Sequence, residues 1–218
     1  MPFAHAAQSI VRYNKFALHY NLVADAVYVK RHPLFSPFDP TFERYLIAAL
    51  LAFDMGRMLG SGPRLRYDPE AGGFANRLHD ALGEVKPLLE SIASKTLIEV
   101  DCDECGEAIR KAYSLLAALT DPNSKFHVGA TKILHFLNPD LFLIIDRNAA
   151  RFLKREFDIP YRIHSRGPYS AELYLKAMKA VKRKIGDYGV RRFADLEPGT
   201  PMLRIFDKIA FATEGLDP

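Results

Sequence analysis

Residues 126–153, FHVGATKILHFLNPDLFLIIDRNAARFL, give the clearest indication of the fold of this 218-residue chain. A glycine-containing turn precedes a short apolar helix, and the Asn-Pro-Asp turn at 138–140 ends it, because proline disfavours helical geometry in the residue before it. The apolar run 141–145 then brings Asp146 to the start of a second, basic helix, where a carboxylate is a favourable N-cap. The stretch therefore predicts two successive helices joined by a tight connection.

Helical periodicity continues on both sides of this stretch. The chain has no repeat, no low-complexity segment and no set of strands large enough for a sheet. We expect an all-α fold of two packed helical lobes, with residues 1–218 forming one compact unit and 126–153 at the junction of the lobes. The expected helices cover 5–30, 40–59, 74–94, 103–119 and 170–185, and a last helix starts at Thr200 and Pro201. The first of them is expected to break near Asn21 or to contain an extended triplet at 27–29, and the third to break at Pro87. Asp101 is expected to cap the helix 103–119, and Ser170 the helix 170–185, which Gly186 or Gly189 ends. The glycine-rich segment 60–73 matches no phosphate-binding fingerprint, so it is predicted to be a turn or lid.

The composition is that of a globular protein without long disordered regions, with 49% hydrophobic and 26% charged residues. The longest apolar run, 45–53, is far shorter than the roughly 20 residues that span a bilayer. The N-terminal segment mixes polar and basic residues into its apolar ones, which is not typical of a signal peptide. We therefore expect no membrane partner and a cytoplasmic location.

Cys102 and Cys105 form a lone Cys-x-x-Cys pair. A structural zinc site needs four ligands, and no second cysteine pair or close histidine pair accompanies them. The acidic turn around them differs from the strand-to-helix context of thioredoxin-like redox motifs. We interpret them as two thiols in a first helical turn, and we predict no metal and no cofactor.

Positive charge is concentrated between residues 147 and 192, which contain 13 Lys or Arg and four Asp or Glu. Such a concentration is typical of surfaces that bind polyanions, because each phosphate contact releases condensed counterions. The alternative is a solvated helix face. Arg147 and Arg151 lie about one helical turn apart, so they either contact phosphate or pair with acids such as Asp140.

Lys132 and Asp146 are the candidate catalytic pair. A carboxylate at a helix start is held ionised by amide donors and by the positive end of the helix dipole. A lysine that is partly desolvated beside it can lose its proton and act as a nucleophile. The pair would support imine chemistry at a sugar C1′, with the carboxylate stabilising the oxocarbenium charge. The alternatives are a plain N-cap for Asp146 and a solvated lysine, while His127 and His135 are expected to be packed rather than catalytic.

The order of Gly129, Lys132 and an apolar run that closes with Asp146 resembles the helix-hairpin-helix DNA glycosylases. The resemblance implies a lysine nucleophile at Lys132, an assisting aspartate at Asp146, a DNA-contacting hairpin glycine at Gly129, and DNA bound by the basic region, for which we name Arg147, Arg151, Lys154, Lys179, Lys182 and Arg183. The chain departs from the family pattern in having one hairpin glycine, a shorter interval between lysine and aspartate, and no four-cysteine iron-sulfur loop. The segment also resembles bacterial proteins to which no activity is attached.

From these residues we predict a DNA-binding protein that acts as a base-excision glycosylase or abasic-site lyase. The alternative is a non-catalytic helical module that binds nucleic acid or a protein.

Overall fold

The computed structural model describes residues 5–30, 40–50, 73–119, 126–161 and 169–215. The regular elements in these ranges are all helices, and none is a β-strand. The helices are α1 (Ala6–Phe16), α2 (Leu18–Lys30), α3 (Pro40–Leu50), α5 (Gly73–Leu89), the 3-10 turn η2 (Glu90–Ile92), α6 (Gly106–Ala117), α7 (His127–Leu137), α8 (Arg147–Phe157), α9 (Tyr169–Tyr188), α10 (Val190–Ala194) and α11 (Met202–Gly215). The all-α prediction is confirmed for the described part of the chain. The predicted turn or lid at 60–73 lies almost wholly outside it, and only Gly73 is described.

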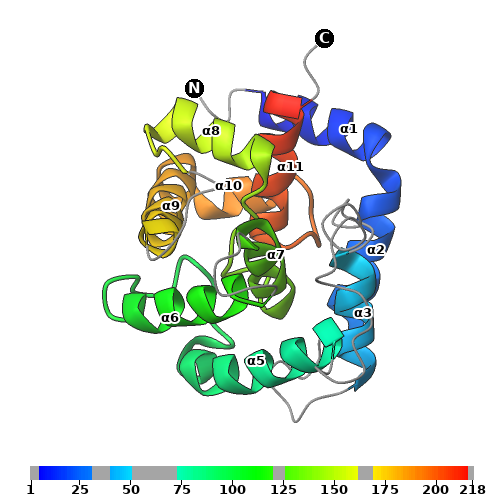
Figure 1. Ribbon diagram of the computed structural model, residues 1–218. Coiled ribbons are helices and arrows are strands. Elements are labelled where there is room, and N and C mark those ends of the chain that lie inside the picture. Colours follow the sequence, from blue (N-terminus) through cyan, green and yellow to red (C-terminus); the bar gives the residue numbers. More distant parts are fainter. Residues whose placement is uncertain (1–4, 31–39, 51–72, 120–125, 162–168, 216–218) are drawn as a thin grey trace.

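Helix α7 occupies the middle of the molecule (Figure 1). Helices α1, α8 and α11 lie on one side of it, and α3, α5 and α6 lie on the other. Helix α11 packs on α1 and α8, α5 packs on α6, and α6 packs on both α7 and α9. Most buried hydrophobic side chains, from α1 to α11, belong to one core cluster. No helix in the described ranges is both long enough and apolar enough to cross a membrane.

Several helix boundaries differ from the predicted ones. The N-terminal helix breaks at Ala17 rather than near Asn21, and the triplet 27–29 is helical within α2. Helix α5 continues through Pro87 to Leu89, since a proline so near the C-terminal end interrupts little of the remaining helix. The next helix begins only at Gly106, because the Asp101 carboxylate accepts hydrogen bonds from the amides of 103 and 104 and so caps the turn before α6. Helix α9 begins one residue before Ser170, so that residue lies within the helix, and it ends at Tyr188 just before Gly189, whose φ is +97°.

The two helices predicted in the central stretch are confirmed as α7 and α8. Asn138 is extended, as a residue before proline should be, and it ends α7. Its side-chain amide donates to the carbonyls of Ala93 and Lys95 at 3.0 and 2.9 Å. Asp140 accepts a hydrogen bond from the Met202 amide at 2.9 Å. The turn therefore fixes the end of α7 against η2 and the start of α11.

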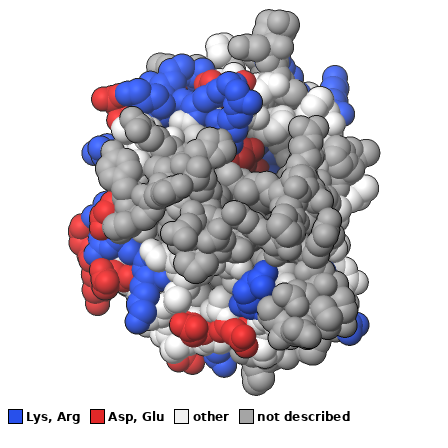
Figure 2. Space-filling view, in the orientation of Figure 1, with Lys and Arg blue, Asp and Glu red and all other residues white. Residues whose placement is uncertain are grey.

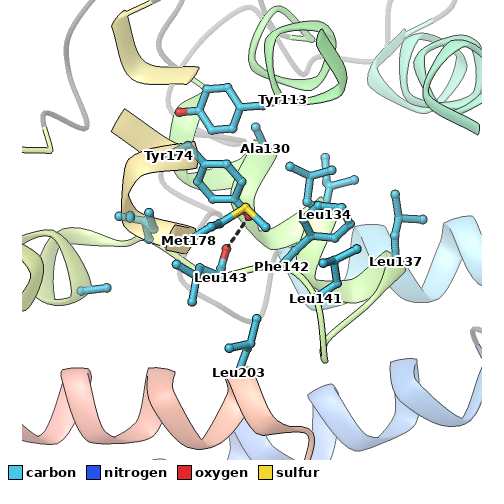
Figure 3. Packing of buried hydrophobic residues seen from close by; sticks show 14 of the residues in the cluster. Tyr113, Ala130, Leu134, Leu137, Leu141, Phe142, Leu143, Tyr174, Met178 and Leu203 are labelled. Carbon is cyan, nitrogen blue, oxygen red and sulfur yellow. Dashed lines mark hydrogen bonds between the residues drawn. The ribbon is translucent and has the colours of Figure 1, made fainter. Parts of the chain in front are cut away.

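The connection 141–145 is buried and belongs to no sheet, so its backbone polar groups need side-chain partners. Thr131 accepts from the Ile145 amide at 3.1 Å, and His135 Nδ1 lies 2.8 Å from the Phe142 carbonyl oxygen. The Tyr174 hydroxyl of α9 donates to the Leu143 carbonyl at 3.1 Å (Figure 3). Side chains of α7 and α9 thus fix the connection 141–145, which sets the direction of α8.

Gly129 and Gly186 provide a matched test of this packing. A Cβ added at Gly129 would lie 2.2 to 2.6 Å from ring atoms of Phe126, whereas one added at the exposed Gly186 meets nothing within 4 Å. We expect Gly129→Ala to lower the free energy of unfolding by about 1–3 kcal/mol or more through overpacking. Gly186→Ala should raise it by about 0.5–1 kcal/mol, because alanine is the better helix former. Urea denaturation of both variants measures these changes, and a neutral Gly129→Ala would contradict the described packing.

Candidate functional site

Asp146 is the N-cap of α8, as predicted. Its Oδ1 accepts hydrogen bonds from the amides of Asn148 and Ala149, each at 2.9 Å. Residue 146 is extended, so the buried connection passes directly into the first helical turn. Arg147 follows at once and is exposed. The half-buried carboxylate of Asp146 therefore lies where the buried connection becomes an exposed basic helix.

Lys132 lies on α7 and is buried, with a relative exposure of 5%. The alternative interpretation, in which Lys132 is a solvated lysine, is therefore wrong. The neighbouring Thr131 accepts from the Ile145 amide, so this turn of α7 lies against the residue that precedes Asp146. The fold thus brings the region of Lys132 next to the start of α8.

Asp207 of α11 links the two predicted catalytic residues electrostatically. Burial raises the pKa of the Asp207 carboxyl to about 6, although the positive charge of Arg204 opposes the shift. The charge of Asp146 raises this pKa further and the charge of Lys132 lowers it. Both side chains must lie near enough to Asp207 for their charges to act on it through the protein interior. The buried groups Lys132, Arg204 and Asp207, from α7 and α11, thus lie near the half-buried N-cap of α8.

Arg204 is the centre of a hydrogen-bond chain that starts from this region. It is 2% exposed and forms an ion pair with Asp207. Its Nη2 donates to the Tyr13 hydroxyl at 2.8 Å and to Asn21 Oδ1 at 3.1 Å. Burial lowers the pKa of the guanidinium, but the charge of Asp207 and the interactions with Tyr13 and Tyr28 together raise it by more, so Arg204 remains charged. This cation therefore joins α11 to both N-terminal helices.

The chain continues from Asn21 to the segment before α11. Asn21 donates to Asn14 at 2.9 Å, and Asn14 donates to Glu197 at 2.8 Å. Glu197 also accepts from Lys208 through both carboxylate oxygens, at 2.8 and 2.7 Å. Burial raises the pKa of Glu197, but the hydrogen bonds from Lys208 and Asn14 lower it below the ordinary value. Each side chain in this series forms at least one hydrogen bond within it, although the buried Nε of Arg204 has no hydrogen-bond acceptor among the described residues.

His135 is a packed histidine, as expected. The Phe142 carbonyl can only accept, so Nδ1 carries the proton that it donates to that oxygen. Nε2 lies 2.8 Å from the Tyr28 hydroxyl of α2. Burial raises the pKa of Tyr28. His135 thus links α2 to α7 and to the buried connection.

His127 is also packed. It is 4% exposed, and its Nδ1 lies 3.1 Å from the Tyr113 hydroxyl, which in turn lies 2.5 Å from that of Tyr161. His127 and His135 thus belong to separate groups of hydrogen-bonded side chains. Across the parts of the chain that the structure describes, no group of three or more His, Cys, Asp or Glu side chains is arranged to hold a metal ion.

The predicted nucleic-acid-binding side chains differ in their surroundings. Arg147, Arg151, Lys154 and Arg183 are exposed, and Lys154 forms an ion pair with Asp158. Lys179 forms an ion pair with Asp103, and Lys182 donates to the Val100 carbonyl at 2.6 Å. The suggested partner of the arginines, Asp140, instead binds the Met202 amide.

Gly129, the predicted hairpin glycine, is the third residue of α7 and is buried, with the Phe126 ring against the position that a Cβ would occupy. Residues 120–125, which precede this turn, lie outside the described residues. Cys102 and Cys105 lie in the turn before α6 and are both free thiols, and burial raises the pKa of Cys102. A raised thiol pKa disfavours the reactive thiolate.

The arrangement brings together groups of the kinds that stabilise developing charge: the fixed carboxylate of Asp146 at a helix start, the buried amine of Lys132 and the buried acid Asp207 near both. Sequence reasoning identified Asp146 and Lys132 but not Tyr13, Arg204 or Asp207. A usable signal was present in α11, where Arg204, Asp207 and Lys208 recur at helical spacing among apolar residues.

Arg204→Met tests the buried cluster. Removing the cation leaves Asp207 buried without its main counter-charge, and breaking such a pair costs about 3–5 kcal/mol at pH 8. The folded pKa of Asp207, about 6, lies above its ordinary value of 3.8, so its contribution to stability falls as pH rises between these two values and is constant above about 6. Losing Arg204 raises that folded pKa further, so the cost should be clearly smaller at pH 5. Urea denaturation at both pH values measures this, with exposed Arg147→Met as the control, and a cost independent of pH would contradict the coupling.

Comparison of the chain with protein-family models, with curated proteins and with solved structures finds no match.

Proposed function

We propose that this chain binds DNA and acts at the N-terminus of α8 as a base-excision glycosylase or abasic-site lyase, within a two-lobed fold of the helix-hairpin-helix glycosylase type. One observation carries the proposal: Thr131 accepts a hydrogen bond from the Ile145 amide at 3.1 Å, so the turn of α7 that carries the buried Lys132 lies against the residue before Asp146. The exposed Arg147 adjoins this site and offers a contact for a phosphate.

In the proposed reaction, the Lys132 amine attacks the sugar C1′ and the damaged base leaves with the electron pair of the glycosidic bond. The amine gives one proton to the departing base and its second proton to O4′ as the sugar ring opens, which leaves an imine between Lys132 and C1′. Asp146 stabilises the positive charge that develops on the sugar. Burial of Lys132 supports the nucleophile role, because desolvation is one route by which proteins activate lysine.

A non-catalytic nucleic-acid-binding module is the second candidate. The low exposure of Lys132, 5%, favours it, because imine formation requires a sugar to reach this amine. In that reading Asp146 serves only as the cap of α8. The exposed arginines of α8 would then account for the whole function.

Borohydride trapping separates the two candidates. We expect wild-type protein to form a covalent adduct with a duplex that carries an abasic site, and peptide mass spectrometry should locate the adduct on Lys132. Lys132→Gln should abolish the adduct, while Lys111→Gln, which changes an exposed lysine of α6, should leave it intact. Asp146→Asn should lower the trapping rate by at least tenfold if the carboxylate stabilises the transition state.

Circular dichroism and thermal melting of each variant separate lost chemistry from lost folding. An adduct on another lysine of the wild-type protein would overturn the role of Lys132. Salt-sensitive DNA binding with neither adduct formation nor base release would establish the non-catalytic module instead.

A further inference from the structure

The basic region falls into two sets that differ in what their cations contact. Lys179 and Lys182 of α9 reach the segment before α6, where they bind Asp103 and the Val100 carbonyl oxygen. Both lysines are partly buried. A cation already held by a carboxylate or a carbonyl must give up that partner, wholly or in part, to bind a phosphate. These two lysines therefore fasten α9 to the 100–103 segment.

Arg147 and Arg151 of α8 are exposed, and no ion pair joins either of them to an acid among the described residues. They are four residues apart, so their side chains leave the same face of α8 about 6 Å apart along its axis. The later cations of α8 are paired, Lys154 with Asp158 and Arg155 with Glu156 and Glu214. The available positive charge of α8 thus lies in its N-terminal half.

Lys and Arg side chains gather over α8 in Figure 2, and acids lie at the margins of that patch as well as along the edge where α6 and α9 lie. The acids of that second region include Asp103, Glu107 and Glu172, of which the last two pair with Arg110. Arg183 is exposed one turn beyond Lys179, on the same face of α9. Arg110 and Lys179 of that region are therefore paired with acids, whereas Arg147 and Arg151 pair with no acid among the described residues.

The first amides of α8 are not open to an anion. A free helix N-terminus is an anion site, but here Asp146 already occupies the amides of Asn148 and Ala149. Its negative charge also repels a phosphate placed at that end. A polyanion near α8 must therefore bind along the side of the helix, where the two arginines extend.

We infer that Arg147 and Arg151 form the phosphate-contacting surface for nucleic acid, and that Lys179 and Lys182 have a structural role instead. The inference rests on the proposed binding of nucleic acid and not on the proposed catalysis. It narrows the interface from the whole 147–192 region to one face of α8, directly beside Asp146.

The salt dependence of DNA binding tests this division. Each phosphate contact contributes about −0.9 to the slope of log K against log salt for duplex DNA. We expect Arg147→Ala and Arg151→Ala each to reduce the magnitude of the slope by about that amount, and the double variant by about twice as much. Lys179→Ala and Lys182→Ala should leave the slope at the wild-type value and lower the melting temperature. Lys111→Ala is the exposed control and should change neither quantity.

Fluorescence anisotropy with an undamaged duplex from 50 to 300 mM KCl gives the slopes without requiring any reaction. Unchanged slopes in the arginine variants, or reduced slopes in the lysine variants, would overturn the inference while leaving nucleic-acid binding in place. Absence of salt-dependent binding by the wild-type protein would overturn the nucleic-acid function itself and the inference with it.

Discussion

The buried ion pair between Arg204 and Asp207 is the interaction on which the arrangement of this protein depends most. Removing two charges from water costs several kcal/mol per ion, and only good geometry and further hydrogen bonds offset that cost. Tyr13 and Asn21 supply those bonds from α1 and α2. The positions of the two N-terminal helices on α11 are therefore specified by polar groups that would be costly to leave unpaired. A merely apolar contact would allow more sliding between these helices.

The same ion pair lies behind the candidate site. Lys132 and Asp146 approach Asp207 because the buried connection between α7 and α8 is held in one conformation by Thr131, His135 and Tyr174. Each of these side chains binds a backbone group that no sheet or helix satisfies. Figure 3 shows the apolar contacts that surround this connection. The direction of α8, and with it the place of Arg147 beside Asp146, follows from these few hydrogen bonds.

Local signals in the sequence predicted much of this arrangement. The Asn-Pro-Asp turn, the N-cap at Asp146 and the apolar stripes are properties of short segments, so the end of α7 and the starts of α8 and α11 were predicted close to their observed positions. The errors arose where distant contacts override local preference. Asn21 does not break the N-terminal helix, because its side chain bonds to Asn14 and Arg204. The triplet 27–29 is helical in α2, where Tyr28 reaches His135 across 107 positions.

The sequence could not reveal the long-range partners of charged residues. Lys179 and Lys182 have the same pattern as solvent-exposed lysines, yet they contact residues 76 and 82 positions away. Arg204 is separated by 191 positions from Tyr13. The glycine at position 129 does not show from the sequence that the Phe126 ring packs against it within α7. Each of these roles depends on chain segments that meet only after folding.

The most direct test of the central claim is a crystal structure of the protein bound to a short duplex that carries a stable abasic-site analogue. The account predicts that the sugar of the analogue lies beside the carboxylate of Asp146, with its C1′ directed at the Lys132 amine, and that flanking phosphates contact Arg147 and Arg151. A duplex seated on α9 and α6, with α8 facing solvent, would contradict it.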